Sequence, residues 1–403
     1  MNMRTICLSS LLACAAIALT SGQAAQKPAA QLAALKIVQL DSPAGADTAE
    51  PALTVEGDRA ILSWLERHED HVMLKYSERK AAGWSASQTV IANEKLMVMP
   101  ADVPSVRALP DGTLVAAWLE DNGGDGESYD LYLSTSKDGR TWSKPSTPHH
   151  DGTKTQHGFP SLVTTPGGGF SVLWLDGRGQ NPETGKGDMT LRAADYGADG
   201  VERRETVIDN RVCDCCPLST AWTSDGLVAV FRDRSPEEIR DIAISRLTAG
   251  KWSAPVPVHR DGWKIEGCPV NGPSVSARGA SVAVAWFTTE NKSERAFVAF
   301  STDAGKTFGE PIRLDDGVAF GRVQIAVLKD GTAAASWVDF TEKRSLLKLR
   351  RLDKTGARGP SVMVAEGIGS AHPKLAQVRD ELLFAWVEST RGTTQVRTAR
   401  ALP

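Results

Sequence analysis

The stretch FSVLWLDGR, residues 170–178, is a short apolar run that ends in a tryptophan and is followed by charged residues and glycine. Runs of the same kind occur elsewhere along the chain. They are AILSWLE around Trp64, LVAAWLED around Trp118, LVAVFRDR around Phe231, VAVAWFT around Trp286, AAASWVD around Trp337 and LLFAWVE around Trp386. With Trp174 included, successive aromatic residues are 54, 56, 57, 55, 51 and 49 residues apart. A pattern repeated at such an interval indicates an array of similar structural units.

Each repeat has the composition of four short strands. A strand opened by proline, such as PSLVTT at residues 160–165, precedes the aromatic strand. A polar loop, a third strand such as DLYLSTS and a fourth strand after GW, TW, KW or TF then follow. Four short alternating strands joined by turns are typical of a propeller blade. We predict an all-β protein folded as a seven-bladed β-propeller of four-stranded blades, with a six-bladed sialidase-type propeller as the alternative.

The last repeat ends at the chain terminus after three strands. The segment LKIVQLD, residues 35–41, has the alternation of a strand and can supply the fourth. An N-terminal strand in that place would close the ring and protect its open edge. We therefore expect one propeller domain over residues 35–403.

The N-terminus has the pattern of a secretory signal peptide. Within residues 1–25, Arg4 precedes an apolar run, and Gly22 and Ala24 are the small residues of a cleavage site. We expect a periplasmic or secreted protein, with residues 26–34 as a linker. The alternative is a lipoprotein signal at LLAC, which ends in Cys14. No apolar run in the sequence reaches the roughly 20 residues of a membrane helix.

The charges are balanced. The chain has 46 basic and 49 acidic residues, and its formal net charge is -3. Since the two signs are mixed along the sequence, nothing predicts binding to nucleic acid or to an anionic membrane. We expect a monomer whose partner is a small-molecule, glycan or protein ligand at the propeller mouth.

Two turns carry a motif. STDAGKTF, residues 301–308, has the form Ser-x-Asp-x-Gly-x-Thr-Phe, and TSKDGRTW, residues 135–142, is a degenerate copy in which the aspartate comes one place later. This motif resembles the Asp-box of the sialidase-like superfamily of BNR-repeat propellers. The resemblance implies a structural turn on the face opposite the active site. Its residues would be Asp138 and Trp142 in one turn, and Ser301, Asp303, Gly305, Thr307 and Phe308 in the other.

The same resemblance sets an expectation for catalysis. A sialidase of this kind would have three arginines holding the substrate carboxylate, a tyrosine nucleophile paired with a glutamate, and an acid/base aspartate. The arginine candidates are Arg178, Arg232, Arg234 and Arg322. The chain has no Phe/Tyr-Arg-Ile-Pro motif in its first repeat, and its tyrosines, Tyr76, Tyr129, Tyr132 and Tyr196, all precede the last three repeats. We predict that it does not work as a usual sialidase.

One face of the propeller gathers the unusual residues. The loops that lead into the first strands and those that join the second and third strands share this face, where propellers bind ligands. We expect a ligand-binding surface there, formed by His157, Asn271, Arg322 and His372. Asp176 and Asp233 could act as acid and base if their carboxyl groups lie roughly 5 to 9.5 Å apart.

Four cysteines belong to the same face once the signal is removed: Cys213, Cys215, Cys216 and Cys268. An even number in an exported protein favours two disulfides, one of which would join adjacent blades. A second interpretation is a copper or zinc site made by three of these thiolates, at positions 213, 216 and 268, with His157. A third is a redox-active thiol.

Three functions stay open on the sequence alone. The first is an exported sialidase-like propeller that binds a ligand, glycan or metal-linked, at its central face without sialidase turnover. The second is a glycan-active hydrolase or lyase that uses carboxylates. The third is a periplasmic copper- or zinc-binding protein that uses the cysteine cluster.

Overall fold

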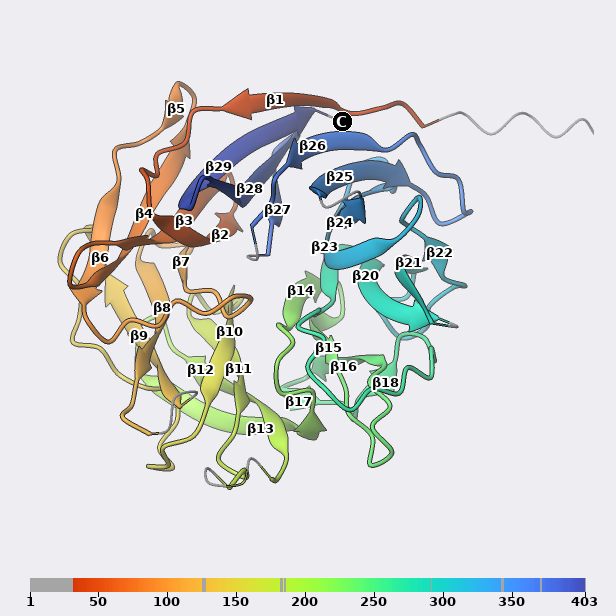
Figure 1. Cartoon of the computed structure of the whole chain (residues 1–403). Helices are drawn as coiled ribbons and strands as arrows, with labels where there is room; N and C mark the ends of the chain where they lie inside the picture. Colours follow the sequence, from red (N-terminus) through yellow and green to blue (C-terminus); the bar gives the residue numbers. More distant parts are fainter. Residues whose placement is uncertain are drawn as a thin grey trace, which may run out of the picture. The chain divides into compact units, whose positions relative to one another are not determined.

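The computed structural model describes residues 32–124, 128–181, 184, 186–290, 292–341, 344–369 and 372–402. The expected signal peptide lies outside them. The described residues form strands and turns and contain no helix, so none of them belongs to a helix that could span a membrane. Their strands form seven small antiparallel sheets arranged in a ring, which is the predicted seven-bladed β-propeller (Figure 1).

The first four blades follow one another along the chain. Blade one contains β2 (Thr48–Glu56), β3 (Arg59–Arg67), β4 (Val72–Lys80), β5 (Gly83–Trp84) and β6 (Gln88–Asn93). Blade two contains β7 (Ser105–Ala108), β8 (Leu114–Asp121) and β9 (Tyr129–Ser136). Blade three contains β10 (His157–Thr164), β11 (Phe170–Asp176), β12 (Met189–Tyr196) and β13 (Glu202–Val212). Blade four contains β14 (Ser219–Thr223), β15 (Gly226–Arg232), β16 (Ile242–Thr248), β17 (Lys251–Trp252) and β18 (Val256–Pro257).

The last three blades complete the ring. Blade five contains β19 (Ser274–Arg278), β20 (Ser281–Glu290), β21 (Ser293–Ser301) and β22 (Ile312–Arg313). Blade six contains β23 (Ala319–Val327), β24 (Ala333–Thr341), β25 (Arg344–Leu352) and β26 (Val362–Glu366). Blade seven contains β27 (Lys374–Val378), β28 (Glu381–Thr390), β29 (Thr393–Leu402) and β1 (Lys36–Leu40). The first strands of neighbouring blades contact one another around the ring centre.

Blade two departs from the predicted four strands. Among the described residues its sheet has three strands, and the place of the fourth is marked by a single bridge between Leu133 and Ser146. The segment beyond β9 contains Pro145 and Pro148. Because proline has no backbone N–H to give to a ladder, this segment cannot pair along its length.

The N-terminal strand closes the ring, as predicted. β1 pairs antiparallel with β29, in a register that places Lys36 opposite Leu402 and Leu40 opposite Thr398. Leu35 and Ile37 pack into the hydrophobic cluster shared by blades six and seven. Blade seven is therefore built from both ends of the chain.

The repeated aromatic residues form the core, with side chains at most 2% exposed. Four of the tryptophans donate a hydrogen bond from Nε1 to the acidic side chain two positions later. The pairs are Trp64 with Glu66 (3.4 Å), Trp118 with Glu120 (2.8 Å), Trp174 with Asp176 (2.7 Å) and Trp337 with Asp339 (2.6 Å). A buried indole needs such an acceptor, and the pattern tryptophan-x-acid supplies it locally.

Both predicted Asp-box turns have the same hydrogen bonds. In one turn the Asp303 carboxylate accepts from the Thr307 backbone N–H (2.9 Å) and from its hydroxyl (2.6 Å). In the other turn Asp138 accepts from the Thr141 backbone N–H (2.7 Å) and hydroxyl (3.0 Å). The hydroxyls of Ser301 and Ser136 each accept a hydrogen bond from the glycine backbone N–H of their own turn, so these two serines are equivalent. Counted from the serine, both aspartates come two positions later, but the second turn has one residue fewer between its aspartate and its glycine. These turns follow third strands and lie opposite the ends where first strands begin.

The closing strand gives a direct prediction. A chain that starts at Asp41 lacks β1 and leaves the β29 edge unpaired, and it loses the burial of Leu35 and Ile37. We expect its free energy of unfolding in urea to be about 3 kcal/mol or more below that of a chain that starts at Leu32. Equal urea midpoints for the two chains would show that the β1–β29 pairing does not hold the ring.

Candidate functional site

A sevenfold set of residues surrounds the mouth of the central channel. In six blades this residue directly precedes the proline of the first strand, and in blade six the equivalent residue precedes Val323. The set is Glu50, Val103, Phe159, Cys216, Gly272, Arg322 and His372. In β2, β10 and β23 the register shifts at this point, and the residues there have positive φ angles of 47°, 56° and 54°. Bulges with left-handed non-glycine residues often mark functional sites.

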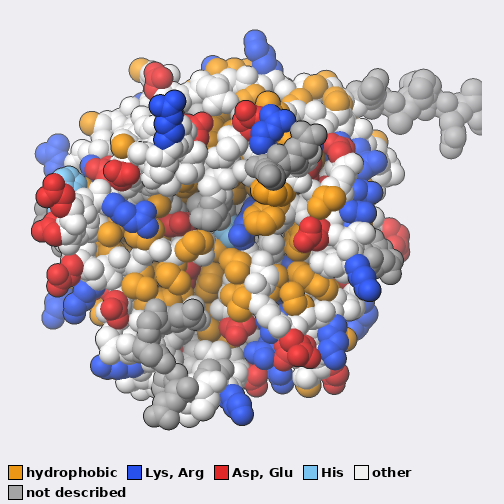
Figure 2. Space-filling view, in the orientation of Figure 1, with side chains coloured by type: hydrophobic (Ala, Val, Ile, Leu, Met, Phe, Trp, Pro, Cys, Tyr) orange, Lys and Arg blue, Asp and Glu red, His pale blue; other side chains and the backbone are white. Residues whose placement is uncertain are grey.

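Below the mouth lies a narrow channel. Its volume is about 270 Å³, and it is lined by side chains of the first strands, most of them small or apolar. Two lining residues, His372 and Lys374, come from the start of blade seven. Figure 2 shows hydrophobic side chains gathered around the middle of the face seen along the ring axis. A polar ligand at the mouth would therefore meet a few ionisable groups together with the hydroxyl and amide groups of the lining, such as Thr54, Ser274 and Gln324.

Two buried carboxyl groups belong to this region. Glu50 is 4% exposed and Asp102 is 1% exposed. Burial raises the pKa of Glu50 to about 7, although Lys374 and Arg67 act in the opposite direction. Burial also raises the pKa of Asp102 to about 7, although its oxygens accept hydrogen bonds from the Tyr129 hydroxyl (2.7 Å) and the Phe159 backbone N–H (2.6 Å). Oε2 of Glu50 has no hydrogen-bond partner among the described residues.

Basic groups face these carboxyls across the mouth. Burial lowers the pKa of Lys374 to about 8, although Glu50 acts to raise it. Burial likewise lowers the pKa of Arg322 to about 10. Glu50 and Lys374 can thus both exchange protons near neutral pH. Titratable groups shifted in this way by burial and by one another are typical of functional sites.

His372 links the basic groups to the backbone. Its Nε2 lies 2.6 Å from Nη1 of Arg322, which is a donor, and 3.1 Å from the Val270 carbonyl. Burial, together with Arg322 and Lys374, keeps the pKa of His372 well below its usual value. A neutral imidazole that accepts from Arg322 at Nε2 cannot also donate to the Val270 carbonyl, which accepts from Nη1 of Arg322 instead. Its proton is then on Nδ1, which has no partner among the described residues.

Asn271 positions the arginine. Its Oδ1 accepts from the Arg322 backbone N–H (2.9 Å), and its Nδ2 donates to the Phe320 carbonyl (3.2 Å). Asn271, Arg322 and His372, which we predicted for the ligand-binding face, therefore lie together at the mouth. His157 does not join them: its ion-pair contacts are with Asp130, Asp151 and Asp176, not with the cysteines of the hypothesised metal site.

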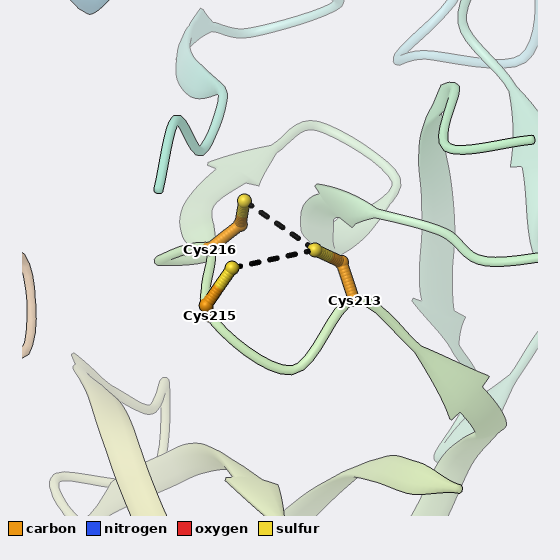
Figure 3. A group of neighbouring side chains, drawn as sticks. All are labelled: Cys213, Cys215 and Cys216. Carbon is orange, nitrogen blue, oxygen red and sulfur yellow. Dashed lines mark hydrogen bonds between the residues drawn. The ribbon is translucent and has the colours of Figure 1, made fainter. Parts of the chain in front are cut away.

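The four cysteines do come together. Figure 3 shows Cys213, Cys215 and Cys216 with their sulfur atoms turned toward one another. Sγ of Cys213 lies 3.5 Å from that of Cys216 and 3.9 Å from that of Cys215. Sγ of Cys215 and Cys268 lie within 4.8 Å of each other. All four are free thiols in the structure, so the expected disulfides are not formed in it.

The cluster sits in a cationic setting. Nη1 of Arg240 lies 3.2 Å from Sγ of Cys213. Hydrogen bonds from Cys215 and Cys216, with the charge of Arg232, lower the pKa of Cys213, whereas burial raises the pKa of Cys216 to about 12. One thiolate among thiol donors is an arrangement suited to metal binding or to thiol–disulfide exchange.

The other catalytic candidates are occupied by contacts within the protein. Arg178 pairs with Asp176 (2.7 Å) and Glu205 (2.9 Å). The guanidinium of Arg232 is buried and donates to carbonyls, among them those of Asn271 and Phe287. Arg234 pairs with Glu238 (2.8 Å). Of the four candidate arginines only Arg322 belongs to the sevenfold set at the mouth.

The proposed acid/base pair is similarly constrained. Asp176 is fully buried and accepts from Trp174 and Arg178, so its pKa is lowered despite burial, and it is poorly suited to act as an acid. Burial raises the pKa of Asp233, and its Oδ1 accepts from the Arg234 backbone N–H (2.7 Å). Asp176 is therefore held in an ion pair with Arg178, which gives it a structural role.

Three mouth residues escaped the sequence analysis: Glu50, Asp102 and Lys374. The signal was present, because the prolines that open six of the first strands place Glu50 in register with Cys216 and His372. Aligning the repeats on those prolines would have found Glu50 directly. Asp102 and Lys374 lie within two residues of the same prolines.

Solved structures of similar fold include two polysaccharide lyases. The polysaccharide lyase Uly1 has 14% sequence identity and a TM-score of 0.55, and the match covers 87% of this chain and 89% of the lyase. A PL25 ulvan lyase has 10% identity and a TM-score of 0.56, covering 89% and 95%. The Hadza microbial sialidase Hz136 has 18% identity over 72% of this chain and 63% of its own, with a TM-score of 0.42. No family model and no curated protein matches the sequence. At such identities the lyases share a fold with this chain, not a demonstrated activity.

The raised pKa of Glu50 predicts a pH dependence of stability. Between pH 4.5 and 7 the unfolded chain releases the Glu50 proton while the folded chain keeps it. The free energy of unfolding should therefore fall as pH rises through this window, by up to about 3 kcal/mol. Glu50→Gln should reduce the slope measured by urea unfolding to the part that Asp102 contributes, whereas Glu94→Gln, at an exposed loop position, should leave it unchanged. A slope unchanged in Glu50→Gln would mean that Glu50 ionises freely in the folded protein.

The sulfur positions predict how the cysteines pair on oxidation. Cys213 with Cys216 and Cys215 with Cys268 need the smallest movements. Tryptic peptides of oxidised protein, separated by mass without reduction, should contain one link between the segments 212–232 and 265–278. Cys216→Ser should keep that link and free one thiol, at Cys213. A link from Cys213 or Cys216 to Cys268 would contradict the pairing.

Proposed function

We propose that this chain is an exported propeller that binds an acidic saccharide at its central mouth and does not carry out the usual sialidase reaction. The observation that carries the proposal is the position of Arg322. It belongs to the buried ionisable cluster with Glu50 and Lys374, and its guanidinium also lies 5.3 Å from the ring centre of Phe320. The signal-peptide pattern supports a periplasmic or secreted location.

The cluster favours an anionic group. Near pH 6 the two raised carboxyl pKa values leave Glu50 and Asp102 largely neutral, while Lys374 and Arg322 keep their charges. The mouth then has a net positive charge in a setting of low polarity. A carboxylate or sulfate would be attracted to it and would supply acceptors for the unpartnered donors there.

Two exposed aromatic residues favour a sugar. Phe320 is 46% exposed and Phe340 is 52% exposed, and their ring centres are 6.3 Å apart. They lie at the start of β23 and the end of β24, on the mouth side of blade six. Exposed apolar groups beside polar ones are typical of binding sites, and a flat ring accepts the C–H face of a pyranose.

Other contacts support the absence of sialidase turnover. The Tyr76 hydroxyl donates to the Gly139 carbonyl at an Asp-box turn, on the opposite face. Tyr129 is fully buried, and its hydroxyl donates to Asp102. Arg178, Arg232 and Arg234 are held by the ion pairs and carbonyls described above, so they are not assembled with Arg322 into a clamp for one carboxylate.

Calorimetry tests the proposal by measuring the affinity of the protein for a hexuronate oligosaccharide. A neutral oligosaccharide of equal length is the control ligand. Lys374→Met and Phe320→Ala should each weaken binding about tenfold or more, a loss of about 1.4 kcal/mol. Lys329→Met, on an exposed turn where Lys329 pairs with Asp380, should have no effect. Affinity should be higher at pH 5.5 than at pH 8.5, since Glu50 and Asp102 become charged and Lys374 becomes neutral. Equal affinity for the neutral oligosaccharide would refute the proposal.

The raised carboxyl pKa values favour a second candidate, a glycan-active lyase or hydrolase. Acid–base catalysis is most efficient when the catalytic pKa lies near the working pH, as it does for Glu50 and Asp102. A lyase reaction would form an unsaturated uronide that absorbs in the near ultraviolet, and a hydrolase reaction would form reducing ends. Release of either product, lost in Glu50→Gln, would support this candidate, and absence of both would exclude it for that substrate.

The gathered sulfurs favour a third candidate, copper or zinc binding at the cysteine cluster. Thiolates suit Cu(I) and zinc, the sulfur atoms of Cys213, Cys215 and Cys216 lie close enough to share an ion, and Sγ of Cys268 lies within 4.8 Å of that of Cys215. Protein purified without reductant should then carry a metal and resist alkylation until the metal is removed. Four cysteines linked in two disulfides would exclude this function.

A further inference from the structure

Two histidines are stacked between blades two and three. His149 lies in the segment that joins these blades, and His157 is the first residue of β10. Their ring centres are 3.8 Å apart and their planes differ by 4°. Both are buried, with 6% and 0% of their surfaces exposed. The stacking turns the nitrogen atoms of both rings toward the same two edges.

At one edge both rings face the Asp130 carboxylate. Its Oδ1 lies 3.3 Å from Nδ1 of His157 and 3.9 Å from Nε2 of His149. Neither nitrogen has a hydrogen bond of good geometry among the described residues, although Nδ1 of His157 is close enough to Asp130 for an ion pair. Two buried imidazole nitrogens without hydrogen bonds, converging on one carboxylate oxygen, are a costly arrangement unless a further group lies among them.

At the other edge the rings are held by Asp151. Nε2 of His157 lies 3.2 Å from Oδ2 of Asp151, within hydrogen-bond geometry, and Nδ1 of His149 lies 3.8 Å from the same oxygen. Asp151 is itself fixed by the backbone N–H of Thr153 (2.9 Å) and lies 3.5 Å from Arg178. A carboxylate that holds the far nitrogen of an imidazole is the usual outer support of a metal-binding histidine.

We propose that Asp130, His149 and His157 bind a divalent transition-metal ion of the zinc class, at the edge opposite Asp151. Metal–ligand bonds of 2.0–2.1 Å in a tetrahedral site separate ligand atoms by roughly 3.4 Å. The three ligand atoms lie within 4.8 Å of one another, and the two imidazole rings must turn out of their parallel stack for both nitrogens to point at one ion. Two imidazoles and a carboxylate favour zinc, cobalt or nickel over calcium or magnesium. Asp130 is 20% exposed on its side chain, which leaves room for a water as the fourth ligand.

This site has a structural consequence for blade two. Asp130 belongs to β9, the last strand of that blade among the described residues, and His149 lies in the segment that replaces its fourth strand. An ion shared by Asp130, His149 and His157 would fasten this segment to both blades. The site is separate from the saccharide proposal and from the cysteine cluster.

Titration of the full chain with cobalt and with zinc tests the inference. The protein is first stripped of metal with a chelator, and its accessible thiols are alkylated. Wild type and His150→Gln, whose histidine pairs with Glu202 at 2.9 Å, should bind one equivalent of Co²⁺ with visible bands and no sulfur-to-cobalt charge-transfer band. His149→Gln and Asp130→Asn should lose at least about 100-fold in affinity, and Asp151→Asn about 10–100-fold. Zinc should raise the thermal midpoint of wild type and of His150→Gln but not of Asp130→Asn.

The inference is overturned if the folded wild type binds no cobalt or zinc, if cobalt shows only thiolate ligation, or if His149→Gln and Asp130→Asn bind as tightly as wild type. Circular dichroism identifies a variant that fails to fold. If His149→Gln does so, Asp130→Asn and the zinc dependence of the wild-type thermal midpoint still decide the question.

Discussion

The pairing of β1 with β29 is the constraint on which the mouth depends. The pairing joins the N-terminal strand to the last blade, so that blade seven is built from both ends of the chain and lies against β2 of blade one. Blade seven carries His372 and Lys374 at the start of its first strand, and both act on residues of other blades. A ring that opened at β1 would therefore also separate Lys374 from Glu50 of blade one.

Within the ring, the first strands bring together groups that are far apart in the sequence. Glu50, Asp102, Arg322 and Lys374 come from four blades, and each has its pKa shifted toward neutral pH mainly by burial. The burial of these groups within the protein, rather than the character of the channel below them, moves their pKa values. The site stores a cost in stability that a ligand carrying its own charge could offset.

Much of the fold could be predicted from the sequence because its signals are local. The tryptophan repeat gave the blades, and the alternation of residues 35–41 gave the closing strand, since both depend on period and position alone. The four-strand prediction failed in blade two, where the prolines at 145 and 148 prevent pairing.

The site was only partly predictable because it depends on which way side chains turn. The gathering of Cys213, Cys215, Cys216 and Cys268 follows from loop order, but the ion pairs that occupy Arg178 and Arg234 do not. His157 was placed on the correct face with the wrong neighbours, since His149 and Asp151, which lie beside it, come from a segment without a repeat signature. Glu50 and Lys374 were missed because a lone charge before or after a proline resembles any solvated loop residue.

The crystal structure of the protein soaked with a uronic acid disaccharide would test the central claim most directly. The account predicts the sugar carboxylate within hydrogen-bond distance of Arg322 or Lys374, with a pyranose ring over Phe320. A disaccharide bound with full occupancy elsewhere, with the mouth left to solvent, would contradict it.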